Sequence, residues 1–289
     1  MGFVGVIVVF VMVFGGFLGE GGKMHVLLHS APLELMIILG AAIGGYIIAN
    51  PTKIIKMGFK MGIKALTAKG PQKRDYVELC QMLFQLFQLF RKDGPQAVEK
   101  HIETPDKSEI FNAYPSFMHN HHAVAFLCDT MKITLSADLS PYDVDDLLDG
   151  DIKAIHAEEH LAQHAIQMVA DGVPGLGIVA AVLGIVITMG ALNQGTEAIG
   201  EHVAGALVGT MIGVFFAYGL IGPNATKVAA DIEAEGRYLQ VIKAAMVALQ
   251  RGAPPIVCIE YARRAIQPEE RPSFDQVDKA TKEIKKAAA

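Results

Sequence analysis

Four long apolar stretches constrain this chain more than any other feature, because each approaches the roughly 20 residues that a helix needs to cross a bilayer. They run from Gly2 to Gly19, Leu35 to Ala49, Val173 to Leu192 and Val203 to Gly222. Since lipid offers the backbone no hydrogen-bond partners, such stretches predict membrane-spanning helices. The second is short, so we expect it to extend beyond its apolar residues or to tilt.

Basic residues predict the side of the membrane on which each connection lies. Between Pro51 and Arg74 there are seven Lys or Arg residues, whereas the connection between the first two spans carries only Lys23. Positive charge marks cytoplasmic segments. The long segment after Pro51, the tail after Pro223 and both termini are therefore predicted to be cytoplasmic. The first stretch lacks a basic leader and a cleavage site, so we expect a retained helix and not a signal peptide.

The pattern predicts an all-α integral membrane protein with four regions. These are transmembrane helices 1 and 2 (1–50), a large cytoplasmic helical domain (51–170), transmembrane helices 3 and 4 (171–223) and a helical cytoplasmic C-terminal region (224–289). One helix face beside the lipid headgroups is expected to carry Lys53, Lys56, Lys60 and Lys64. Ser140-Pro141 predicts the start of a helix that leads into the third span.

Charge and cysteine usage narrow the possible partners. A net charge of −5, with no cluster of basic and aromatic residues, argues against nucleic-acid binding. The three cysteines fall in segments predicted to be cytoplasmic, where thiols stay reduced, so we expect no disulfide framework. They are Cys80, Cys128 and Cys258.

Small residues predict close contacts between membrane helices. Glycine recurs every four residues in the fourth span, at Gly205, Gly209 and Gly213, and in the second, at Gly40 and Gly44. Glycine at this spacing lets two helix backbones approach closely in lipid. We therefore expect these faces to be helix contacts.

The last two spans contain no Asp, Glu, Lys or Arg. Their polar side chains are few, and a threonine in a membrane helix usually bonds its own backbone. The polar residues are Thr188, Thr210 and Tyr218, with Asn193 and His202 near the outer ends. Because an ion crossing a bilayer normally needs an ionisable side chain, a conducting complex would need a carboxylate from a partner chain.

Two prolines, Pro174 and Pro223, stand at corresponding ends of these spans. Taken singly, Pro174 could be an ordinary first-turn proline and Pro223 an ordinary helix stop. Beside Gly172, Gly175 and Gly222, each marks a place where helix geometry can change near the membrane edge. A gate or a conformational relay is the function that this placement indicates.

Other charged groups admit simpler interpretations. His156-Ala157-Glu158-Glu159-His160 matches an inverted zinc-protease motif, but no third ligand is evident, and a solvated helix face is the favoured interpretation. Arg91 and Glu99 flank the Gly94-Pro95 turn and are candidate partner contacts. Charges near the tail, such as Arg263-Arg264, are expected mainly to be solvated.

Short motifs spread over nearly the whole chain form an ordered set. They are Gly15-Gly16, Glu109 to Pro115, Pro174 to Gly184, Leu207 to Thr210, Ala217 to Gly219 with Pro223, Ala253 to Ile256, Glu260 with Arg263, and Glu270 to Phe274. Together they resemble the MotA family, the membrane stator subunits of the bacterial flagellar motor, in its proton-driven proteobacterial branch.

The resemblance implies a homo-oligomeric ring in the inner membrane, around a dimer of a single-span MotB-type partner that carries an intramembrane Asp. It implies that Pro174 and Pro223 lie beside that Asp and that Thr210 lines the ion path. Ala181 stands where sodium-driven relatives have a second threonine, which favours protons, and Thr188 departs from a close relative. We group Tyr218 with this ion-path and gating set.

The same resemblance implies that Arg91 and Glu99 contact the charged rotor protein FliG. It implies no cofactor and no enzymatic activity. The near alternative is an ExbB- or TolQ-like proton-channel subunit that energises outer-membrane processes, although those relatives usually have three spans. A zinc protease is the remaining alternative.

Overall fold

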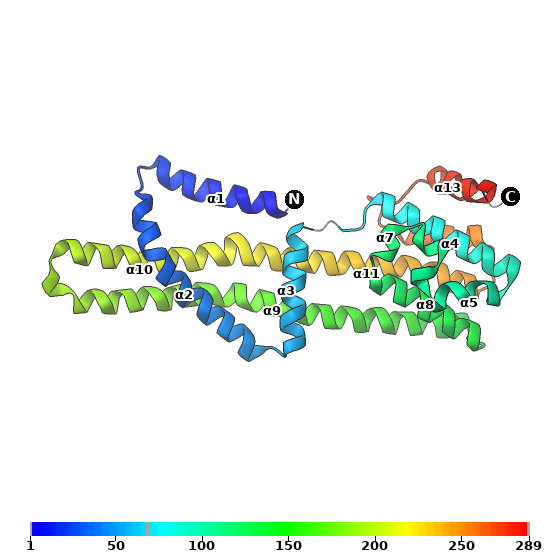
Figure 1. Ribbon diagram of the computed structural model, residues 1–289, viewed down its shortest axis with the longest axis horizontal. Helices are drawn as coiled ribbons and strands as arrows, with labels where there is room; N and C mark the ends of the chain where they lie inside the picture. The colour runs from blue at the N-terminus through cyan, green and yellow to red at the C-terminus, as the bar shows by residue number, and fades with distance from the viewer. Residues whose placement is uncertain (1, 68–69, 288–289) are drawn as a thin grey trace. The chain divides into compact units, whose positions relative to one another are not determined.

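The computed structural model describes residues 2–67 and 70–287, and no strand occurs among them. They form two compact units, one within 1–68 and 158–231 and the other within 69–157 and 232–289. The first contains α1 (Gly2–Gly19), α2 (Met24–Ala49), α3 (Thr52–Thr67), η2 (Leu192–Gln194), α10 (Thr196–Phe216) and the π-helical turn η3 (Ala217–Ile221). Two long helices, α9 (Pro141–Gly190) and α11 (Gly222–Gln250), continue from one unit into the other (Figure 1).

The described helices include four that are long and apolar enough to cross a membrane. The first matches the predicted span from Gly2 to Gly19. The second, α2, begins at Met24 and not at Leu35, so the expected extension is confirmed, and it places both Pro32 and Glu34 inside the helix. The third is the last part of α9, which runs without a break from Pro141 into the membrane, as predicted.

Glycine contacts hold α9 against α10, and the two helices lie side by side (Figure 1). A Cβ atom added to Gly213 would lie 2.8 Å from the Cα atom of Gly177, and one added to Gly184 would lie 2.9 Å from the Cβ atom of Ala206. The residue numbers at the contacts increase along α9 while they decrease along α10, so the two helices are antiparallel. Because apolar side chains gain little by hiding from lipid, this close backbone approach is what joins the helices.

The contact between α2 and α10 confirms part of the glycine prediction and limits the rest. Gly205 faces the side chain of Ser30, and Gly209 faces that of Glu34. The residue numbers at the contacts increase along both α2 and α10, so these two helices are parallel. A Cβ atom added to Gly40 or Gly44 would meet nothing within 4 Å in the described part of the chain, so the prediction for that pair is not confirmed there.

Helix α3 is amphipathic and packs beside the membrane helices. Its four lysines are all exposed, as their spacing predicts, and Lys53 forms an ion pair with Glu158 of α9. Its buried face includes Gly58, where an added Cβ atom would lie 3.4 Å from the carbonyl oxygen of Ala162. The side chain of Asn224 donates a hydrogen bond of 3.0 Å to the carbonyl oxygen of Gly62. The lysine-bearing face of α3 is therefore exposed, while its apolar face packs against α9 and α11.

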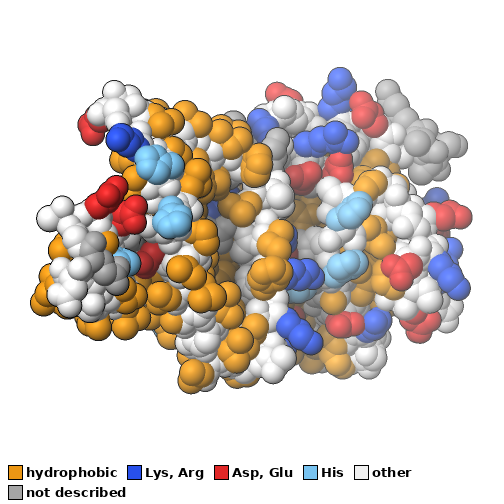
Figure 2. Space-filling model, turned by 60° about the vertical axis from the view of Figure 1, so that its left-hand side comes forward, with side chains coloured by type: hydrophobic (Ala, Val, Ile, Leu, Met, Phe, Trp, Pro, Cys, Tyr) orange, Lys and Arg blue, Asp and Glu red, His pale blue; other side chains and the backbone are white. Residues whose placement is uncertain are grey.

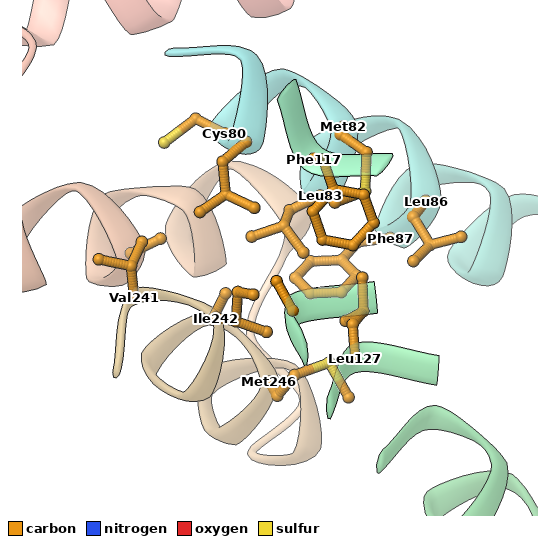
Figure 3. Packing of buried hydrophobic residues seen from close by; sticks show 14 of the residues in the cluster. Cys80, Met82, Leu83, Leu86, Phe87, Phe117, Leu127, Val241, Ile242 and Met246 are labelled. Carbon is orange, nitrogen blue, oxygen red and sulfur yellow. The ribbon is translucent and has the colours of Figure 1, made fainter. Parts of the chain in front are cut away.

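The second unit is built on a single apolar core. Its further helices are α4 (Lys73–Asp93), α5 (Pro95–Glu103), η1 (Pro105–Lys107), α6 (Glu109–Asn112), α7 (Pro115–Met118), α8 (His121–Ser136), α12 (Pro255–Ala265) and α13 (Phe274–Ala287). Figure 3 shows Leu83 and Phe87 of α4 packed with Phe117, Leu127 and Met246 from three other helices. Since α4 buries one continuous face, it is the centre of this unit.

Local sequence sets the ends of the helices around this core. Ser140 accepts a hydrogen bond of 3.2 Å from the backbone N–H of Asp143, and its own N–H donates one of 3.1 Å to the Asp143 carboxylate. These hydrogen bonds hold the pKa of Asp143 below its usual range. The reciprocal pair is a capping box, and it explains why α9 begins at Pro141. The three cysteines are free and buried.

Candidate functional site

Pro174 lies inside α9 and is half-buried, with regular helix on both sides. A proline has no backbone N–H, so the carbonyl of Ala170, four residues earlier, loses its usual donor in the helix. The helix therefore contains a weak point at the start of its membrane part. That weakness does not end the helix, in contrast to the interpretation of such a proline as a boundary.

Pro223 does not end its helix either, and the interpretation as a helix stop is wrong. The five residues before Gly222 form a π-helical turn, closed by the N–H of Gly222 on the carbonyl oxygen of Ala217. A regular α-turn would press the proline ring against the carbonyl of Gly219, and the wider turn relieves this clash. Beyond it, α11 continues to Gln250. π-Turns are rare and occur frequently at functional sites.

The remaining ion-path candidates lie at one level of the α9–α10 pair. A Cβ atom added to Gly209 would lie 3.2 Å from that of Ala180, so the next residues along each helix, Thr210 and Ala181, share that level. Both are half-buried. Pro174 precedes Ala181 by about two helical turns, so the two side chains lie on nearly the same face of α9.

Thr188 belongs to a different environment. It is only 6% exposed, and its hydroxyl donates a hydrogen bond of 2.8 Å to the carbonyl oxygen of Gly184 in the preceding turn. This is the backbone bond expected of a threonine in a membrane helix. Its hydroxyl is therefore satisfied by the helix, which accounts for this polar residue in an apolar span.

A broad apolar surface surrounds these residues. On the face drawn in Figure 2, hydrophobic side chains form large exposed areas. On α9 the exposed apolar side chains include Ile178, Val182 and Ile185, and Tyr218 of the π-turn is 71% exposed. A surface of this extent in a single chain must be covered by lipid or by other protein chains.

Arg91 and Glu99 lie in the second unit and differ in their surroundings. The guanidinium of Arg91, at the end of α4, donates hydrogen bonds to the backbone carbonyls of Gly252 and Ala253, the latter at 3.1 Å. Glu99, on α5, is exposed. Gly94 joins the two helices with a φ of +83°, which favours glycine. Arg91 therefore also fixes the link between α11 and α12.

The charges near the tail form a structural cluster. The prediction that they are mainly solvated is wrong for Arg263, whose side chain is 13% exposed, whereas that of Arg264 is 73% exposed. Arg263 and Arg264 both bond the carboxylate of Glu260, at 2.7 and 2.6 Å. Hydrogen bonds from Arg263 lower the pKa of Glu260 to about 2, with a smaller effect from Arg264. Arg263 also donates to the carbonyl oxygen of Pro272 at 3.1 Å. The cluster thereby joins α12 to the segment that follows it.

The histidine motif of α9 does not resemble a metal centre. His156 points at α11, because a Cβ atom added to Gly236 would overlap its ring, and the ring is half-buried. The predicted solvated face is therefore partly a packing face. Among the residues that the structure describes, no group of three or more His, Cys, Asp or Glu could hold a metal ion.

Sequence reasoning missed Glu34. The predicted second span began one residue after it, whereas α2 begins ten residues before it. Its side chain is 8% exposed and faces Gly209 of α10. The signal that could have revealed it was the position of Pro32 and Glu34 directly before the apolar run, where a longer helix would enclose both.

The chain is similar to known proteins over nearly its full length. Residues 3–94 match the family described as Motility protein A N-terminal, and residues 119–240 match the MotA/TolQ/ExbB proton channel family. The Chemotaxis protein LafT of Vibrio parahaemolyticus is 36% identical over 96% of each chain. Motility protein A of Escherichia coli is 31% identical over 97% of this chain and 95% of that protein.

Two solved structures share the fold. The C. jejuni MotAB structure matches with a TM-score of 0.76 at 19% identity and covers 94% of this chain and 98% of that chain. The flagellar MotAB stator complex from Bacillus subtilis matches with a TM-score of 0.73 at 23% identity, covering 96% and 98%. At these identities the likeness concerns the fold alone.

Proposed function

This chain belongs to the MotA family, and on that premise we propose that it is a stator subunit of the bacterial flagellar motor, forming a proton channel with a MotB-type partner. The observation that carries the proposal is the α9–α10 pair, which has no charged residue between Val173 and Gly190 or between Val203 and Phe216, yet has an exposed apolar side. A charged path along such a wall needs a carboxylate from a second chain. The partner would supply it as an intramembrane Asp.

The proposed arrangement is a multi-pass inner-membrane protein with both termini in the cytoplasm. The excess of basic residues after the second span supports it. Identical subunits would form a ring around a partner dimer, with the exposed apolar surfaces of α9 and α10 turned inward. Lipid would cover α1, all of whose residues are at least partly exposed.

The proline and threonine positions acquire roles in this arrangement. Thr210 and Ala181 line the ion path, while Pro174, Pro223 and Tyr218 form the gating elements at one end of it. Protonation removes the charge of the partner Asp, and the adjacent helices respond to that local electrostatic change. The weak point at Pro174 and the wide turn before Pro223 are where the response requires least energy. A proton crossing ~100 mV releases roughly 2.3 kcal/mol, so torque requires many transits.

Deletion of the gene tests the proposal directly. We expect cells that lack this chain to carry normal filaments and not swim, because the motor is assembled but not driven. Wild-type chain should restore swimming only when the single-span partner is present. Normal swimming in a strain with no second stator would contradict the motor role. Loss of energised outer-membrane uptake in place of swimming would favour the ExbB- or TolQ-like alternative.

We further propose that Arg91 and Glu99 contact the charged rotor protein FliG, and the two should respond differently to truncation. Arg91→Ala leaves the carbonyls of Gly252 and Ala253 without a charged donor, so we expect it to destabilise the exposed end of α4 by about 1 kcal/mol. Glu99→Ala should change stability by less than ~0.5 kcal/mol. Both should reduce swimming. Thermal unfolding and swim-ring assays measure the two effects, and full swimming by Glu99→Ala would exclude its rotor contact.

A further inference from the structure

Glu34 is a carboxyl group buried in the contact between α2 and α10. It is 8% exposed, and among the described residues its Oε2 atom has no hydrogen-bond partner. A Cβ atom added to Gly209 would overlap that oxygen. The absence of a side chain at Gly209 therefore leaves the space that the carboxyl group occupies.

Glu34 has no lysine or arginine near it within this group of helices. The residues of α1, α2 and α10, and those of α9 from Val173 to Gly190, include no Lys or Arg. The titratable side chains of the helices packed around it are His25, His29 and Tyr46 of α2, of which the two histidines are exposed, and Glu197, Glu201 and His202 of α10. An ionised carboxylate buried without a cation is costly. Burial of this kind favours the protonated form of a carboxyl group over the ionised form.

On the contact face between α2 and α10, the polar side chains near Glu34 lie on the side of Ser30 and His202. One turn earlier on α2, the hydroxyl of Ser30 lies 3.3 Å from the position of a Cβ atom on Gly205. The half-buried His202 precedes Gly205 by three residues on the same face of α10. Beyond Glu34 the same face of α2 continues with Ile38 and Ala42, which are buried and apolar. These polar side chains form a row of three, His202, Ser30 and Glu34. The row begins near the end of α10 that adjoins η2 and ends at Glu34.

Glu34 also lies at the level of the ion-path candidates. The position of a Cβ atom on Gly209 adjoins both the carboxyl group of Glu34 and the side chain of Ala180, and the residues that follow are Thr210 and Ala181. The carboxyl group of Glu34 therefore adjoins Gly209, the residue of α10 that directly precedes Thr210. This position brings the carboxyl group of Glu34 close to the proposed ion path.

We propose that Glu34 is a second proton-binding group of the channel, supplied by this chain, which loads protons from the outer end through Ser30 and His202. In each transfer the O–H bond of Glu34 breaks as an O–H bond forms on the partner carboxylate. A hydronium ion at the outer end then returns a proton to the Glu34 carboxylate through His202 and Ser30, and water remains. This inference rests on the stator function proposed above.

The variants Glu34→Gln and Glu34→Asp separate proton binding from packing. Gln keeps the size and hydrogen-bonding capacity of the side chain but cannot release a proton, whereas Asp keeps the proton. Both are compared with wild type in the complete complex, with membrane abundance as the control for folding. We expect the low-load motor speed of Glu34→Gln to fall by about tenfold or more, because proton relays commonly contribute ~100-fold to a rate. Stall torque should change little, since it reflects the free energy per proton and not the transit rate.

Infrared spectroscopy of the complex in lipid gives a readout that does not depend on rotation. We expect a protonated-carboxyl band at neutral pH that is lost in Glu34→Gln, displaced in Glu34→Asp and sensitive to deuterium. Wild-type low-load speed in Glu34→Gln, or no band removed by that change, would overturn the proposal. If Glu34→Gln does not accumulate, Glu34→Asp decides, because an unmoved band would equally exclude Glu34. Failure of the wild-type chain to drive rotation would instead contradict the stator function. The infrared band would still show whether Glu34 carries a proton, because that readout does not depend on rotation.

Discussion

Cells that carry Pro174→Ala in place of the wild-type chain should build filaments and fail to swim, although the protein accumulates normally. Alanine restores a backbone N–H, which can donate to the carbonyl of Ala170 and remove the weak point in α9. Proline in a helix interior costs about 3 kcal/mol relative to alanine. We therefore expect function to be lost while helix stability rises. Swim-ring diameter, filament staining and thermal unfolding of the purified chain measure the three quantities.

Pro141→Ala is the matched control for this prediction. Pro141 occupies the first turn of the same helix, where its missing N–H removes no helical hydrogen bond. Swimming should be unaffected there. Wild-type swimming in Pro174→Ala would refute a gating role for this residue, and poor accumulation of the variant would show that Pro174 acts in folding.

Gly213→Ala should separate α9 from α10 and prevent assembly of the complex. Its added methyl group would lie 2.8 Å from the Cα atom of Gly177 and 3.1 Å from the carbonyl oxygen of Val173. These are backbone atoms, so no side-chain rotation can relieve the overlap. Overpacking of this kind costs about 1–3 kcal/mol, which exceeds the gain of up to ~1 kcal/mol from replacing glycine in a helix.

Gly40→Ala provides the comparison, since a methyl group there meets nothing within 4 Å in the described part of the chain. It should leave the stability of the single chain equal or slightly higher. Thermal unfolding in lipid, together with co-purification of the partner, distinguishes the two variants. Equal unfolding temperatures for both would show that the α9–α10 contact is looser than the structure describes. Loss of assembly by Gly40→Ala alone would place that face at a contact between subunits.

The spans and the continuous helix from Pro141 to Gly190 could be predicted because they depend on short-range properties. An apolar run of about 20 residues has few alternatives to a helix in lipid, and the Ser140 cap depends on residues three positions apart. The glycines of the fourth span were also predictable as a packing face. The π-turn before Pro223 was not, because it depends on how a continuing helix accommodates the proline ring.

By itself the sequence determined the all-helical class, the membrane spans, the candidate positions Pro174, Pro223 and Thr210, and the absence of charged residues from the last two spans. Only the tertiary structure decided the partners of Glu34 and Arg91. Glu34 meets Gly209, and Arg91 bonds the carbonyls of Gly252 and Ala253, across separations of more than 150 residues. Helix formation follows from neighbouring residues along the chain, whereas the burial of a charged or polar side chain depends on which distant helix packs against it.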